Sequence, residues 1–207
     1  MGERANQRHA SAATGTSLGG GLSSTGIGRA GPVAAQPFLA ADVGGTHARI
    51  GLVVAAPGGQ SVKVLHYHRY SCADWSGLPA MLGDFVAQLE ASPHAALCSQ
   101  INDCAVACAG YVLDDAIVNE NLPWPVSIGE IRAALGIRQL AVINDFEAVA
   151  YATQFIGADD AMSIIESSRP ATRGPVLVMG PGTGLGSAVL LPGQPRAQVL
   201  ATEAGQI

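Results

Sequence analysis

Two short glycine-rich segments of the sequence have the composition of phosphate-binding turns. They are Asp42-Val43-Gly44-Gly45-Thr46 and Gly180-Pro181-Gly182-Thr183-Gly184-Leu185-Gly186. Glycines let the backbone approach an anion closely, so that its N–H groups can donate hydrogen bonds to phosphate oxygens. The hydroxyls of Thr46 and Thr183 add one donor to each segment. For each segment the alternative is a structural turn that uses the glycines for their backbone freedom. The second segment is not a P-loop, because no Gly-Lys-Ser or Gly-Lys-Thr follows it.

Carboxylates follow apolar runs at two points of the chain, where they could serve phosphoryl transfer. Asp42 could hold Mg²⁺ through water, because this ion keeps much of its hydration shell. Asn144 and Asp145 end another apolar run, and ligands of open α/β sheets bind at the carboxyl ends of strands. Asp145 could therefore take the proton of an attacking hydroxyl as general base. The alternative is that Asn144 or Asp145 caps the helix that follows, and both roles can coexist on neighbouring residues.

The composition argues against nucleic-acid and membrane partners. The 207 residues carry a net charge of −5, and the eleven lysines and arginines are scattered, whereas nucleic acids are bound through clustered basic side chains. No apolar run reaches the length of about eighteen residues that a membrane-spanning helix needs. The cysteines contain no C-x-x-C pair, so we expect buried, reduced thiols and a cytoplasmic location. They are Cys72, Cys98, Cys104 and Cys108.

Periodicity predicts the elements that must position these residues. Residues 1–36, rich in glycine, serine and alanine, are expected to form a disordered leader. Three strands should follow as an antiparallel meander at 38–42, 48–54 and 62–70. Further along, the patterns predict an amphipathic helix at 77–91, a buried strand at 104–109 and a small hairpin or edge strand at 112–118.

Further elements are predicted from residue 127 to the end of the sequence. Ser127 and Glu130 form a capping box that opens a helix to Leu135, and Gly136 ends that helix. A buried strand at 140–143 and a helix at 146–155 come next, and the last strands are expected at 176–179, 187–191 and 198–201. The order strand, glycine turn, strand thus occurs twice. We expect a first domain over 37–156 and a second unit that begins near Gly157.

Four motifs in this order give the chain a resemblance to a known family. They are Asp42-Val43-Gly44-Gly45-Thr46-His47-Ala48-Arg49, Asn121-Leu122-Pro123-Trp124, Ile143-Asn144-Asp145-Phe146-Glu147-Ala148-Val149-Ala150 and the segment 180–186. The sequence resembles the actin-like ATPase superfamily of sugar kinases and, within it, the bacterial glucokinase family. The resemblance runs from about Phe38 to the last residue.

The resemblance implies an α/β protein of the ribonuclease H-like (actin-like ATPase) fold, whose two domains close over glucose with ATP and Mg²⁺ between them. It implies transfer of the ATP γ-phosphoryl group to the 6-hydroxyl of glucose, with Asp145 as the catalytic base and Asp42 near the metal. The implied sugar-binding residues are Asn121, Asn144, Asp145, Glu203 and Gln206. The implied phosphate-binding residues are Ala41, Asp42, Val43, Gly44, Gly45, Thr46, Gly182, Thr183 and Gly184.

Two departures from the family pattern leave alternatives open. Ala204-Gly205-Gln206 stands where the family has Gly-Gly-His, so a kinase for mannose, fructose or an amino sugar is one alternative. Family members also continue well past this length, so residues 157–207 are expected to form only the start of the second domain. A truncated chain would be weakly stable and inactive alone. A non-catalytic sugar-binding relative is the third alternative, and a homodimer is left open for a full-length form.

Overall fold

The computed structural model of the protein describes residues 36–55, 62–119, 121–165, 174–181, 184–193 and 196–202. These residues belong to one compact unit, 34–207, so the division near Gly157 stays a prediction. All but one residue of the predicted leader lie outside the described residues. No helix among the described residues is long and apolar enough to span a bilayer.

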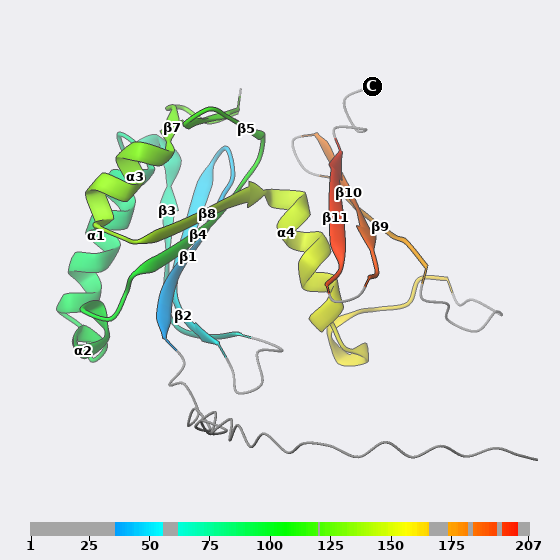
Figure 1. The fold of residues 1–207 in the computed structure, drawn as a ribbon, viewed down its shortest axis with the longest axis horizontal. Coiled ribbons are helices and arrows are strands. Elements are labelled where there is room, and N and C mark those ends of the chain that lie inside the picture. Colours follow the sequence, from blue (N-terminus) through cyan, green and yellow to red (C-terminus); the bar gives the residue numbers. More distant parts are fainter. Residues whose placement is uncertain are drawn as a thin grey trace, which may run out of the picture. The chain divides into compact units, whose positions relative to one another are not determined.

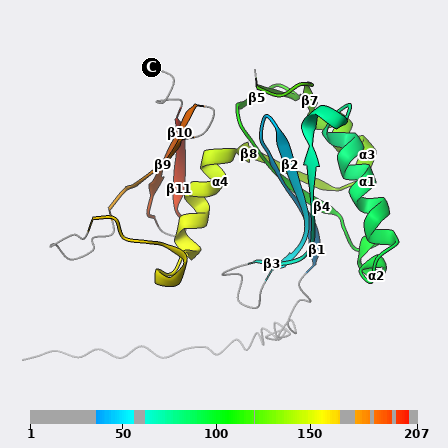
Figure 2. The same cartoon turned by 180° about the vertical axis from the view of Figure 1, so that it is seen from behind.

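Five strands form one twisted layer of the fold (Figures 1 and 2). Its strand order is β3-β2-β1-β4-β8. The first three strands form the predicted antiparallel meander, and β4 and β8 run parallel to β1. Their bounds are β1 (Pro37–Val43), β2 (His47–Ala55), β3 (Val62–Ser71), β4 (Asp103–Cys108) and β8 (Gln139–Asn144).

The period-two pattern of the strands explains the core of this sheet. Leu39, Ala41 and Val43 of β1 are buried, whereas Asp42 between them is exposed. Ile50 and Leu52 of β2 are buried in the same core. Strand β8 is predicted to be buried, but its residues are partly buried or exposed. It is an edge strand of the sheet, so it has a neighbour on one side only.

Helices cover the core, and their ends follow local sequence signals. The helices are α1 (Leu78–Glu90), α2 (Ala95–Cys98) and α3 (Ile128–Leu135), with a short 3₁₀ turn η1 (Cys72–Asp74) before them. The apolar residues of α1 recur at helical spacing and are buried, as the periodicity predicts. The Ser127 side chain accepts a hydrogen bond from the Glu130 backbone N–H at 3.2 Å. Gly136 ends α3 with a left-handed φ of 61°.

The chain forms a separate three-stranded sheet of order β5-β6-β7 between strands β4 and β8 of the sequence. It comprises β5 (Tyr111–Leu113), β6 (Ala116–Val118) and β7 (Val126–Ser127), so the predicted hairpin at 112–118 is confirmed. Trp124, in the turn before β7, is buried in the main core.

A second core forms between helix α4 (Asp145–Ala152) and a meander of three antiparallel strands. The strands are β9 (Val176–Pro181), β10 (Leu185–Leu191) and β11 (Gln198–Thr202). The helix is shorter than predicted, because a 3₁₀ turn η2 (Thr153–Phe155) replaces its last turn. A further 3₁₀ turn, η3 (Ala158–Asp160), follows.

Two glycines of the second predicted phosphate segment shape this core. Gly180 and Gly186 face each other across β9 and β10. A Cβ atom on Gly180 would lie 2.8 Å from Cζ of Phe146, and a Cβ atom on Gly186 would overlap the same ring outright. We call these two residues the glycine platform. Packing of Phe146, rather than phosphate binding, accounts for two of the four glycines in this segment.

Candidate active site

Parallel strands bring the predicted catalytic residues to one edge of the sheet. In the register of the ladders, Val43 lies opposite Cys108, and Cys108 lies opposite Asn144. Asp42 at the end of β1 and Asp145 after the end of β8 therefore share the carboxyl edge, where open α/β sheets bind their ligands.

The helix cap at the end of β8 belongs to Asn144. Its side-chain oxygen accepts hydrogen bonds from the backbone N–H groups of Phe146 at 2.9 Å and Glu147 at 3.2 Å. Its amide nitrogen donates to the Gly110 carbonyl at 3.2 Å, which ties β8 to the segment that follows β4. The capping alternative is thus confirmed for Asn144. Because Asn144 makes the cap, the Asp145 carboxylate is not needed for that role.

The surroundings of Asp145 raise its pKa. Burial is the largest cause, because it disfavours the charged form, and the negative charge of Asp42 adds to it. The hydrogen bond that Asp145 accepts from the Phe146 N–H opposes these effects. A carboxylate with a raised pKa is a better proton acceptor than an ordinary surface aspartate.

The raised pKa of Asp145 predicts a pH-dependent cost to stability. The folded state holds this proton to a higher pH than the unfolded chain, whose ordinary value is 3.8. The ionised carboxylate is therefore destabilising at neutral pH, and that cost disappears as the pH falls towards 3.8.

We expect Asp145→Asn to raise the thermal unfolding midpoint at pH 7 by about 1–2 °C, since partial solvent screening keeps the effect below about 1 kcal/mol. The gain should shrink as the pH is lowered to about 4, as followed by circular dichroism. Asp159→Asn, at an exposed carboxylate of η3, is the matched control. A gain that grows on acidification would contradict the prediction.

Asp42 is the residue that fits a hydrated metal ion. Its side chain is 54% exposed, and its Oδ2 accepts a hydrogen bond from Arg49 Nη1 at 2.8 Å. The described residues contain no group of three or more histidine, cysteine or acidic side chains placed to hold a metal ion. A single exposed carboxylate is a ligand that Mg²⁺ accepts when waters and substrate phosphates complete its coordination.

Cys72 anchors the first glycine loop from within the core. Its backbone N–H donates to the Thr46 carbonyl at 2.9 Å, and its thiol donates to the Gly44 carbonyl at 3.3 Å. The Cys72 carbonyl accepts a hydrogen bond from Trp124 Nε1 at 3.1 Å. Sequence reasoning did not assign Cys72 to the site, since nothing in its local pattern signals these contacts.

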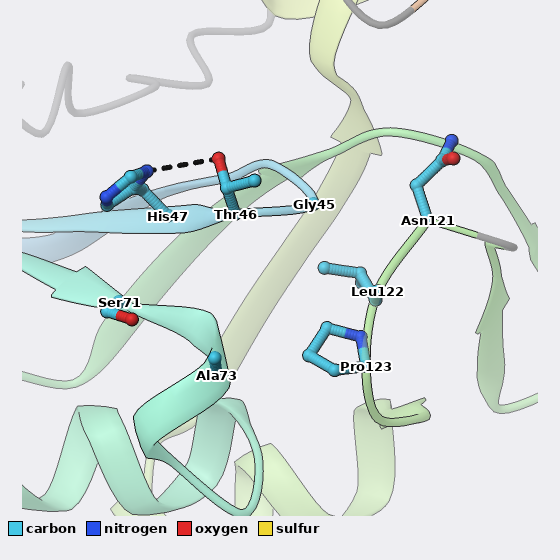
Figure 3. Close-up of a pocket in the computed structure, with 8 residues that line it drawn as sticks. All are labelled: Gly45, Thr46, His47, Ser71, Ala73, Asn121, Leu122 and Pro123. Atoms are coloured by element: carbon cyan, nitrogen blue, oxygen red, sulfur yellow. Dashed lines mark hydrogen bonds between the residues drawn. The ribbon is translucent and has the colours of Figure 1, made fainter.

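The same loop touches the segment that carries Asn121. A Cβ atom on Gly45 would lie 2.8 Å from the Asn121 carbonyl oxygen, so only glycine fits there. Thr46 and Asn121, the predicted phosphate and sugar ligands, line one open pocket of about 530 Å³ (Figure 3). The pocket is lined by Gly45, Thr46, His47, Ser71, Ala73, Asn121, Leu122 and Pro123.

A second pocket, of about 460 Å³, holds Asn144. It lies between the ends of β4 and β8, helix α4 and strand β11, with Thr202 on its wall. The predicted sugar residues Asn121 and Asn144 are thus in two different pockets, and the structure does not bring them into one.

The remaining predicted phosphate and sugar ligands lie partly inside and partly outside the described residues. Gly184 comes directly before β10, and Ala41 and Val43 are buried in β1. The remaining predicted ligands lie outside the described residues, and they are Gly182, Thr183, Glu203 and Gln206.

The predicted state of the cysteines is confirmed for three of the four. Cys72, Cys104 and Cys108 are buried, Cys98 is partly buried, and all are free thiols. Burial raises the pKa of Cys104 to about 12, and burial together with the charge of Asp145 does the same for Cys108. These thiols are therefore protonated and unreactive at neutral pH.

The arrangement of the five-stranded sheet, an antiparallel meander followed by parallel β4 and β8, recurs in a solved sugar kinase. A solved glucokinase from an Antarctic psychrotroph superposes with a TM-score of 0.68 at 31% identity, covering 83% of this chain and 51% of that one. The α/β, actin-like ATPase fold expected from the sequence is confirmed.

The chain belongs to the glucokinase family, whose model matches residues 39–207. It is 42% identical over 171 residues to a glucokinase-like protein of Xylella fastidiosa, with 82% of this chain and 48% of that protein covered. A glucokinase of Paramagnetospirillum magneticum is 36% identical, with 83% of this chain and 50% of the relative covered. The chain thus spans about half the length of the curated relatives it matches.

Proposed function

We propose that this chain supplies the phosphate-binding and proton-accepting residues for the phosphorylation of glucose to glucose 6-phosphate by ATP. The observation that carries the proposal is the meeting of Asp42 and Asp145 at the carboxyl edge of β1, β4 and β8. Membership of the glucokinase family supports the choice of reaction.

The first glycine loop would bind the phosphates of ATP. The backbone N–H of Gly45 is a donor for phosphate oxygens, and the hydroxyl of Thr46 adds one more. The Gly44 N–H donates to the His47 carbonyl at 3.0 Å and closes the turn, so Gly44 would serve by letting the phosphate approach. Two hydrogen bonds from the buried Cys72 hold the Gly44 and Thr46 carbonyls of this loop, so the loop is fixed before the ligand arrives. The second segment, Gly182 to Gly184, would supply further donors to the phosphates.

Asp145 would take the proton from the 6-hydroxyl of glucose as that oxygen attacks the γ-phosphorus. Phosphoryl transfer depends mainly on positioning and charge stabilisation, so the base acts late and needs only to be well placed. The cap made by Asn144 fixes Asp145 at the start of α4. Mg²⁺, held near Asp42, would neutralise charge on the transferred phosphate.

The setting of the reaction is also part of the proposal. Free, buried thiols fit a reducing compartment, so we place the protein in the cytoplasm. Glucose or a related hexose is the proposed partner. A homodimer stays a prediction.

The test is hexose-dependent release of ADP from ATP. It uses a joined protein, in which this chain is followed by the part of the Xylella relative that the chain does not match. Glucose should give the highest kcat/KM in a panel with mannose, fructose and N-acetylglucosamine. Release of ADP that does not depend on any hexose would contradict the proposal, and a preference for another hexose would correct the substrate.

A further inference from the structure

Arg69 of β3 and His47 of β2 form a hydrogen-bonded chain that ends on Thr46 of the first glycine loop. Nη2 of Arg69 lies 3.0 Å from Nε2 of His47. Nδ1 of His47 lies 3.0 Å from Oγ1 of Thr46, and Figure 3 shows this contact at the pocket opposite Asn121. The chain links strand β3 to the residue that the proposed function assigns to phosphate.

The chemistry of arginine fixes the direction of every bond in this chain. A guanidinium group has only donors, so Nε2 of His47 must accept. In the neutral ring the proton then resides on Nδ1, and this N–H donates to the Thr46 oxygen. Because that oxygen already accepts a bond, its hydroxyl hydrogen remains to donate elsewhere.

Charge balance does not account for the position of Arg69. It stands directly opposite Arg49 in the ladder of β2 and β3, and like charges opposite each other are unfavourable. The salt bridge seen in the described part of the chain joins Arg49 to Asp42, and Arg69 uses the imidazole of His47 instead.

We propose that Arg69 is a positioning residue, which acts through the tautomer of His47 to aim the Thr46 hydroxyl at a phosphate oxygen of ATP. This inference rests on the proposed function for the identity of the ligand. The hydrogen-bonded chain itself does not depend on that function.

The first experiment measures the tautomer of His47 in the 207-residue chain, without ligand. Nitrogen-15 shifts of the imidazole distinguish a protonated from an unprotonated ring nitrogen, and His47→Asn assigns the signals. We expect the proton on Nδ1 in the wild type and a mixture of tautomers in Arg69→Met. A wild-type ring that carries its proton on Nε2 would overturn the inference.

The second experiment is a double-mutant cycle on binding of MgATP, followed by NMR titration of the backbone amides around Thr46. Loss of one hydrogen bond should weaken binding about 3- to 10-fold in Arg69→Met. Thr46→Val should weaken it at least as much, and Arg69→Met should have no further effect in that background. Lys63→Met, which removes another exposed cation from β3, is the matched control and should stay within about twofold.

The outcomes separate the inference from the proposed function. An Arg69→Met effect that persists unchanged in Thr46→Val would show that Arg69 acts through its charge, which overturns the positioning role. If the wild type shows the Nδ1 proton but binds no MgATP, the nucleotide site and the ligand assigned to Thr46 both fail, and only the hydrogen-bonded chain stands.

Discussion

Asp145→Asn should lower kcat for glucose phosphorylation in the joined protein by about 10²- to 10⁴-fold, the usual contribution of a general base. Asparagine has nearly the same shape and can still accept the hydrogen bond that the Phe146 N–H donates to Asp145. The asparagine side chain cannot take a proton, so the substitution should slow the chemical step and lower kcat. The measurement is coupled detection of glucose 6-phosphate under saturating substrates.

A matched control and a binding measurement separate this effect from misfolding. Asp159→Asn should keep the wild-type kcat, because Asp159 is exposed on η3 and outside the carboxyl edge. Binding of MgATP by Asp145→Asn should be retained or slightly improved, since a negative charge near the phosphates is removed. An Asp145→Asn protein with a kcat within tenfold of the wild type would remove Asp145 as the base.

Gly186→Ala should destabilise the chain by about 3 kcal/mol, in the upper part of the range for overpacked cores. The new methyl group would occupy the space of the Phe146 ring, so either the ring or strand β10 must move. Denaturant unfolding measured by fluorescence and circular dichroism would give the change in the free energy of unfolding.

Two further variants test the cause of that loss. Gly184→Ala, where a Cβ atom meets nothing within 4 Å, should change stability by less than about 0.5 kcal/mol. Phe146→Leu replaces the ring by a smaller side chain. The loss of unfolding free energy caused by Gly186→Ala should therefore be smaller in the Phe146→Leu background, with a coupling of about 1 kcal/mol or more. Full additivity of the two substitutions would show that the clash is not the cause.

Local patterns were sufficient to predict most of the elements. The buried face of α1, the ends of α3 and the meander of β1, β2 and β3 follow from periodicity and capping residues. The carboxyl-edge position of Asn144 and Asp145 follows from an apolar run that ends in polar residues. Burial of β8 was overestimated, because an apolar run does not reveal which strand lies at the edge of a sheet.

Contacts between distant segments could not be predicted in this way. Cys72 holds the first glycine loop through hydrogen bonds to Gly44 and Thr46, but a single cysteine after a strand carries no sign of them. The chain from Arg69 to Thr46 depends on the register of β2 and β3. Register is a property of paired strands, so neither segment shows it alone.

The packing of Phe146 on the glycine platform has a mechanical consequence for catalysis. Phe146 follows the proposed base directly in the chain, and its ring is held by β9 and β10. We therefore expect a shift of β9 and β10 to move the start of helix α4, and with it the Asp145 carboxylate. Substitutions in those strands would alter turnover through the placement of the base, so the region that tunes the rate extends beyond the residues that touch substrate.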